Sequence, residues 1–154
     1  MTIETKADLN ADTIDGLQDL IQINLDSAKG FAEAARRVES ESLKVLFTDM
    51  ARAREHNATE LQQYVERNGE HACQDGSLAA AFHRVWLDFR GRLAGGDALV
   101  ILTEAVRGEE HIKAVYEEVL VRTAGSALNS VLTRQYSSVK AGHNKVRDLR
   151  DGYK

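Results

Sequence analysis

The sequence predicts an all-α fold, a four-helix bundle with a long crossover that carries a short extra helix between helices two and three. Three observations predict it. The 154 residues include no proline, which long helices exclude because it removes a hydrogen bond and clashes with the preceding turn. Apolar residues recur at spacings of three and four, the period of a helix with one buried face. Glycine-containing turns separate the periodic segments at unequal intervals.

Four long segments carry the helical period, and we expect helices near 12–39, 41–68, 97–123 and 126–150. The positions predicted to face inward on the first two are Ile14, Leu17, Ile21, Asn24, Ala28, Phe31, Ala35 and Val38, then Leu43, Leu46, Met50, Ala53, Asn57, Leu61 and Tyr64. On the last two they are Ala98, Leu102, Ala105, Glu109, Ile112, Tyr116 and Val119, then Leu128, Leu132, Gln135, Val139, His143, Val146 and Leu149. Four stripes of this length are typical of a bundle.

The connections predict the order of the helices. The first helix passes into the second at Ser40–Ser42, and Gly125-Ser126 joins the last two, so each pair is antiparallel. Residues 69–96 are too many for a tight turn and predict a crossover along the bundle, with a short helix near 78–92. The second and third helices would then run parallel, which is the ferritin-like arrangement. We expect Trp86 to be buried where this short helix packs on the bundle.

Length and composition predict one soluble domain over residues 1–154, in which residues 1–11 are flexible. Hydrophobic residues make up 43% and charged residues 29%. The net charge of -4 argues against nucleic acid as the main partner. The longest apolar run, Ala98–Leu102, is far shorter than the roughly 20 residues that span a bilayer. The polar start lacks the apolar core of a signal peptide, and Cys73 is the only cysteine, so a cytoplasmic protein is the simplest interpretation.

Two stretches, GSLAAAFHRVWLDFRGRLAGGDALVILTEAVRGEEHIKAVYEEVL and RQYSSVKAGHNKVRDLRD, resemble a bacterial family of four-helix-bundle proteins of unknown function in the ferritin-like superfamily. The residues that carry the resemblance are His83-Arg84 with Trp86, Gly95-Gly96-Asp97, Glu104, Arg107-Gly108-Glu109, Tyr116, Gln135 and His143. The similarity extends from about Ile14 to the C-terminus. Val85 departs from the pattern, which has a glycine there. The resemblance implies the fold but no function, because the family has none assigned.

The metal-ligand signature of ferritin-like di-iron proteins is a Glu-x-x-His pair on each of two helices, facing inward. None of the five histidines follows a glutamate by three residues, since Ala53, Asn68, Ala80, Gly108 and Lys140 stand there. What remains is Glu109 and His143 on inward stripes, with Glu60 at the edge of another. We interpret them as part of a hydrogen-bonded polar layer that fixes helix register. The alternative is a degenerate metal site made of Glu60, Glu109 and His143.

Two functions therefore stay open. The favoured one is a non-catalytic bundle, an interaction or stress-related protein that self-associates, with a homodimer as the simplest form. It has no catalytic residues and no cofactor. The alternative is a metal-binding ferritin-like protein that handles iron or manganese or acts as an oxidase or peroxidase. Clustering of Glu60, Glu109 and His143 around one point would favour the alternative, and exposed apolar surface on the crossover would favour the first.

Overall fold

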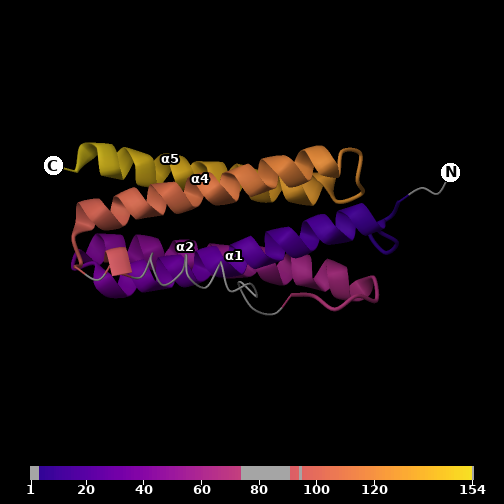
Figure 1. The fold of residues 1–154 in the computed structure, drawn as a ribbon, viewed down its shortest axis with the longest axis horizontal. Helices are drawn as coiled ribbons and strands as arrows, with labels where there is room; N and C mark the ends of the chain where they lie inside the picture. Colours follow the sequence, from indigo (N-terminus) through magenta and orange to yellow (C-terminus); the bar gives the residue numbers. More distant parts are fainter. Residues whose placement is uncertain (1–3, 74–90, 94, 154) are drawn as a thin grey trace.

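The computed structural model describes residues 4–73, 91–93 and 95–153. Within them the chain forms four long helices, which are α1 (Ala11–Arg37), α2 (Glu41–Arg67), α4 (Ala98–Arg122) and α5 (Asn129–Gly152). They lie along one another as an all-α bundle (Figure 1), so the predicted fold class is confirmed. None of these helices is long and apolar enough to cross a membrane.

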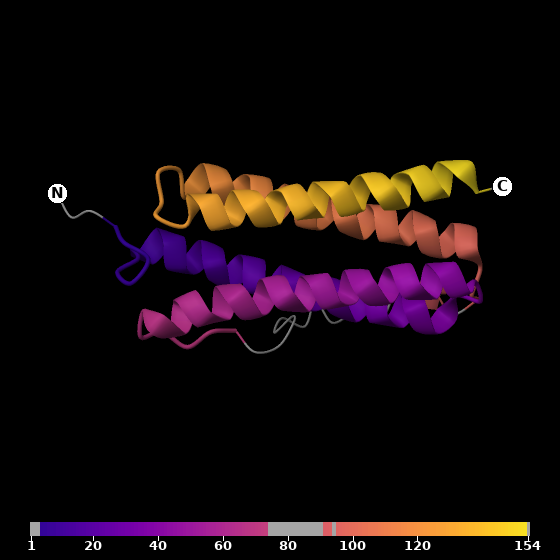
Figure 2. The ribbon, with the colours of Figure 1, turned by 180° about the vertical axis from the view of Figure 1, so that it is seen from behind.

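The helices form two antiparallel hairpins, α1 with α2 and α4 with α5 (Figures 1 and 2). In both views α2 and α4 run in the same direction, as the long connection predicts. Close backbone approaches join α1 to α2, α4 to α5 and α1 to α4. The predicted helix near 78–92 and the expected burial of Trp86 fall mainly outside the described residues. Of that segment, residues 91–93 are helical.

Side-chain caps explain where three of the helices begin. The side-chain oxygens of Asn10, Ser40 and Asp97 accept hydrogen bonds from backbone amides in the first turns of α1, α2 and α4. Such caps satisfy amides that the helix itself leaves without partners. The predicted starts near residues 12, 41 and 97 lie within one residue of the observed starts.

The fourth helix begins at Asn129, three residues later than predicted. Gly125 has a φ of 81°, a left-handed conformation that glycine adopts without strain. The Glu4 carboxylate then accepts hydrogen bonds from the Ser126 hydroxyl and the Ala127 amide, at 2.6 and 2.8 Å. These residues are held in the turn by the N-terminal segment, so the helix starts only after them.

The core has two apolar clusters, one toward each end of the bundle. One contains Leu17, Leu20, Ile21, Leu61, Val65, Ile112, Tyr116, Val119, Leu128, Leu132 and Val139 among its members. The other contains Phe31, Ala34, Leu43, Phe47, Met50, Leu93, Ile101, Leu102, Val106 and Val146 among its members. On each helix, buried polar residues lie between the parts that contribute to the two clusters. We call these residues, Asn24, Arg54, Asn57, Glu109 and His143, the polar layer.

The inward face of α2 differs from the predicted one by one residue. The prediction placed Leu46, Ala53 and Tyr64 inside, whereas Phe47, Arg54 and Val65 are the buried residues. Ala53 is exposed, and Leu46 and Tyr64 are half-buried. Successive inward residues of a helix lie three or four positions apart. At these turns the apolar residues indicated a position one residue away from the one that faces inward. The correction brings an arginine into the core.

Candidate functional site

The polar layer crosses the middle of the bundle and is the candidate functional site. Each of the four helices supplies at least one residue of this layer, because each has a buried polar residue near the middle of the bundle. Buried polar and charged groups are costly unless they are paired. The partners of each group therefore decide what the layer can do.

An ion pair lies in the polar layer. The Arg54 Nη2 atom donates to Glu109 Oε2 at 2.5 Å, and the two side chains are only 2% and 0% exposed. Burial raises the pKa of the Glu109 carboxyl, while the charge and hydrogen bond of Arg54 act in the opposite direction. The Arg54 guanidinium also lies over the Phe31 ring, 5.9 Å from its centre. The pair joins α2 of one hairpin to α4 of the other.

Gly142 on α5 makes room for this ion pair. A Cβ at position 142 would lie 2.9 Å from Glu109 Oε2 and 3.0 Å from Arg54 Nη2. Real Cβ contacts are essentially never shorter than 3.0 Å. Packing against the ion pair therefore explains why a glycine stands in the middle of α5. Gly108 has no comparable neighbour among the described residues, since nothing lies within 4 Å of a Cβ there.

His143 lies beside the ion pair, near the surface. Its side chain is 11% exposed, and Nε2 lies 3.7 Å from Oε1 of the exposed Glu110. Nδ1 lies 3.4 Å from Asn144 Oδ1. A positive charge on His143 would lower the pKa of Glu109, so the two groups are close enough to interact.

Three buried atoms of this group have no hydrogen-bond partner among the described residues. They are Arg54 Nε, Glu109 Oε1 and His143 Nε2. An unpartnered buried polar atom loses its hydration without compensation. The hydrogen-bonding groups of the ion pair are thus only partly satisfied, which makes its burial costly.

The other two residues of the polar layer, Asn24 and Asn57, belong to a chain of hydrogen bonds that links all four helices. Asn24 Nδ2 donates to the Tyr116 hydroxyl at 2.9 Å, and this hydroxyl donates to Gln135 Oε1 at 2.8 Å. Asn57 Nδ2 donates to Asn24 Oδ1 at 3.3 Å. Gln135 Nε2 donates to Glu60 Oε1 at 2.7 Å. Because each member has a partner, this chain fixes how the helices are aligned.

Glu60 ends the chain at the surface. Its second carboxylate oxygen accepts a hydrogen bond from Arg134 Nη2 at 2.7 Å. Burial raises the pKa of Glu60, but hydrogen bonds from Arg134 and Gln135 outweigh it and leave the pKa below its ordinary value. Both carboxylate oxygens of Glu60 therefore bind side chains of α5.

The three candidate metal ligands thus fall into two groups. Glu109 and His143 lie together beside Arg54, whereas Glu60 ends the hydrogen-bond chain. Within the described residues, no three His, Cys, Asp or Glu side chains lie close enough together to hold a metal ion. The donor set does not fit a two-metal site, since Arg54 faces one inward carboxylate and Arg134 with Gln135 occupies the other.

Arg54 is the residue that the sequence interpretation missed. It follows Met50 by four residues and precedes Asn57 by three, so its spacing suits the inward stripe as well as that of Ala53. The signal that could have found it is Glu109. An inward carboxylate needs a positive partner, and Arg54 is a cationic residue of α2 at a helical spacing that allows it to face inward.

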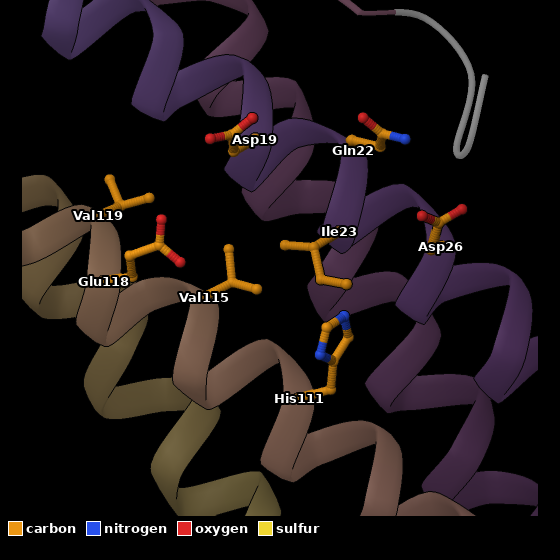
Figure 3. A pocket seen from close by; sticks show the side chains of 8 residues that line it. All are labelled: Asp19, Gln22, Ile23, Asp26, His111, Val115, Glu118 and Val119. Atoms are coloured by element: carbon orange, nitrogen blue, oxygen red, sulfur yellow. The ribbon is translucent and has the colours of Figure 1, made fainter. Parts of the chain in front are cut away.

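A groove of about 280 Å³ lies between α1 and α4, at the edge of the core (Figure 3). Ile23, Val115 and Val119 are its apolar lining, and Asp19, Gln22, Asp26, His111 and Glu118 are its polar lining. Burial raises the pKa of Asp26 to about 7, with Lys29 acting in the opposite direction. His111 of α4 faces α1 across this groove (Figure 3).

One family model matches the chain over residues 12–122, and it is described as Domain of unknown function (DUF2383). The match covers α1, α2 and α4, including Arg54 and Glu109, but stops before α5. It confirms the predicted membership in a family of unknown function. No curated protein matches the chain.

Proposed function

We propose that this chain, which belongs to the DUF2383 family of domains of unknown function, is a non-catalytic helical bundle that works by binding another protein. One observation carries the proposal: the guanidinium of Arg54 neutralises the inward carboxylate of Glu109. In ferritin-like di-iron proteins the inward carboxylates bind metal ions instead. Here the positive charge comes from a side chain, so the core needs no metal to balance its buried carboxylate.

Exposed apolar side chains supply the contact surface. Five of them belong to the bundle end where α2 and α4 begin and α5 ends, and we call them the end patch: Val45, Leu99, Val100, Leu149 and Tyr153. They are between 38% and 60% exposed. Contiguous exposed apolar surface is typical of sites that bind protein, and in this proposal the five side chains form such a surface at this end. A second copy of the chain is the simplest partner, which gives a homodimer.

The alternative function is binding of a single iron or manganese ion by Glu109 and His143. It is favoured by the unpartnered Glu109 Oε1 and His143 Nε2 atoms, which are both buried. Oxygen and imidazole donors suit such metals. Against it stands Arg54, whose positive charge next to Glu109 repels a cation.

Elemental analysis of protein purified without a metal-affinity tag separates the two functions. We expect iron and manganese at background level, in both the natural protein and Glu109→Gln. The proposal fails if the natural protein carries one or more ions per chain and Glu109→Gln loses them.

Light scattering coupled to size-exclusion chromatography tests the contact surface. We expect a dimer that dissociates in Val45→Asp and Leu99→Asp, since a charge at an apolar contact is left without a partner. Val121→Asp is the matched control, because Val121 is 80% exposed in the last turn of α4, at the other end of that helix. Equal dissociation in all three variants, or none in any, would count against the end patch.

A further inference from the structure

The two sides on which the hairpins meet are packed differently. On one side α1 touches α4 closely, because a Cβ at Gly16 would lie 2.9 Å from Val119 Cγ1 and 3.3 Å from Thr123 Cγ2. Only glycine allows the two helices to approach this far. An ion pair at 2.8 Å between Asp19 and Arg122 lies next to this contact. The backbones of α1 and α4 therefore approach closely at Gly16, where the groove between these two helices ends.

The opposite side, between α2 and α5, has no such dense backbone contact, although both helices are described throughout. Long polar side chains bridge it at the edge of the apolar core that α2 and α5 share. Glu60 accepts hydrogen bonds from Arg134 and from Gln135, both at 2.7 Å. Gln135 Nε2 also lies 3.4 Å from the Asn57 carbonyl oxygen, which is a weak hydrogen bond. Water can replace each of these polar partners, so loss of these bridges costs less than loss of the same number of apolar contacts.

The ion pair of the polar layer lies where an opening on this side would reach it. Arg54 belongs to α2, Glu109 to α4, and Gly142 and His143 of α5 cover the pair. The three unpartnered atoms, Arg54 Nε, Glu109 Oε1 and His143 Nε2, would gain water if α5 moved away from α2. Their hydration lowers the free energy of an opened state relative to that of the closed one.

We infer that the bundle opens between α2 and α5, with the Gly16–Val119 contact of α1 and α4 as the hinge. The Arg54–Glu109 ion pair separates on opening, and its hydration favours the open state. The two hairpins move as units, because each is held together by its own helix packing. Such a partial opening costs less than global unfolding. It exposes core residues of both apolar clusters, including Val139 and Val146 of α5. The inference concerns motion and does not depend on the proposed dimer.

Thiol labelling at two matched positions tests the direction of opening. In a Cys73→Ser background, Val139→Cys places a thiol one turn after Gln135 on α5, and Val119→Cys places one at the hinge. Both valines are almost completely buried, at 0% and 1% exposure. Without denaturant we expect the thiol at 139 to react at least about tenfold faster than the thiol at 119, after correction for rates in the unfolded protein. Its rate should also depend less on denaturant, because less surface is exposed by a partial opening.

Equal rates and equal denaturant dependence at both positions would overturn the inference, since only global unfolding would then expose them. Faster labelling at 119 than at 139 would overturn it as well.

A second pair of variants tests the part that the ion pair plays in opening. Arg54→Met with Glu109→Met replaces the ion pair by apolar side chains, which removes the gain in hydration on opening. We expect labelling at 139 to slow by about tenfold toward the rate at 119. Glu109→Gln alone leaves Arg54 buried without its counter-charge and should speed labelling at 139. If the double variant leaves the ratio of the two rates unchanged, the ion pair does not favour opening.

Discussion

The Arg54 guanidinium on α2 and the Glu109 carboxylate on α4 form an ion pair of 2.5 Å that connects the two hairpins inside the core. Both side chains lose almost all contact with water, and each keeps one polar atom that has no hydrogen-bond partner among the described residues. Such a pair contributes little net stability, because desolvation opposes the attraction. Its loss on one side only is costly, because the remaining charge stays buried alone.

The first prediction concerns this asymmetry. Arg54→Met should lower the free energy of unfolding by about 3–5 kcal/mol, since Glu109 is then buried without a partner. Arg54→Met with Glu109→Met should restore most of that loss. Urea unfolding followed by circular dichroism measures both. Similar losses in the single and the double variant would show that the pair itself is strongly stabilising.

The second prediction concerns two glycines that both lie within helices. Gly142→Ala should destabilise the protein by about 1–3 kcal/mol, because the new methyl group overpacks against Glu109 and Arg54. Gly108→Ala is the matched control, since that position is exposed and open among the described residues. Alanine should stabilise the helix there by up to about 1 kcal/mol. Thermal unfolding of the two variants should thus shift in opposite directions.

The third prediction concerns the hydrogen-bond chain. Tyr116→Phe removes the hydroxyl that accepts from Asn24 and donates to Gln135. Both amides stay buried, so we expect a loss of about 1–3 kcal/mol in the free energy of unfolding. Tyr136→Phe is the control, because its hydroxyl binds Glu117 at the surface, and it should change stability by less than about 0.5 kcal/mol. A Tyr116→Phe protein as stable as the control would mean that water takes the place of the hydroxyl.

The fourth prediction concerns the pH dependence of stability at Glu60. Its pKa in the folded protein is below the ordinary value of 4.5, so its ionised form stabilises the fold. This contribution is present above pH 4.5 and is lost as the pH falls through the folded pKa. Glu60→Gln should cost about 1 kcal/mol at pH 7, because Arg134 is largely exposed and the pair is screened.

Unfolding of Glu60→Gln and the natural protein, measured from pH 7 down to pH 3, checks this sign. The two stability curves should converge at the acidic end. Glu66→Gln, at an exposed position of the same helix, should follow the natural protein throughout. Curves that stay parallel over the whole range would exclude a pKa effect at Glu60.

The residue pattern determined the architecture because each signal is local. The absence of proline and the helical period depend only on neighbours in the chain. The same holds for the caps that the structure shows at Asn10, Ser40 and Asp97. The lengths of the three connections then left few ways to arrange the helices. The start of α5 was missed, since it depends on Glu4, which is distant in sequence.

The tertiary structure decided which side chains meet. In a helix with 3.6 residues per turn, positions three and four residues further on lie about 60° and 40° to either side of the starting residue. Spacing alone therefore cannot choose between Ala53 and Arg54 for the inward face of α2. Burial of Glu109 on another helix decides it, because a buried carboxylate requires a positive partner. The sequence predicted by itself that a polar layer exists, but only the packing of four helices showed that its charge is balanced by Arg54.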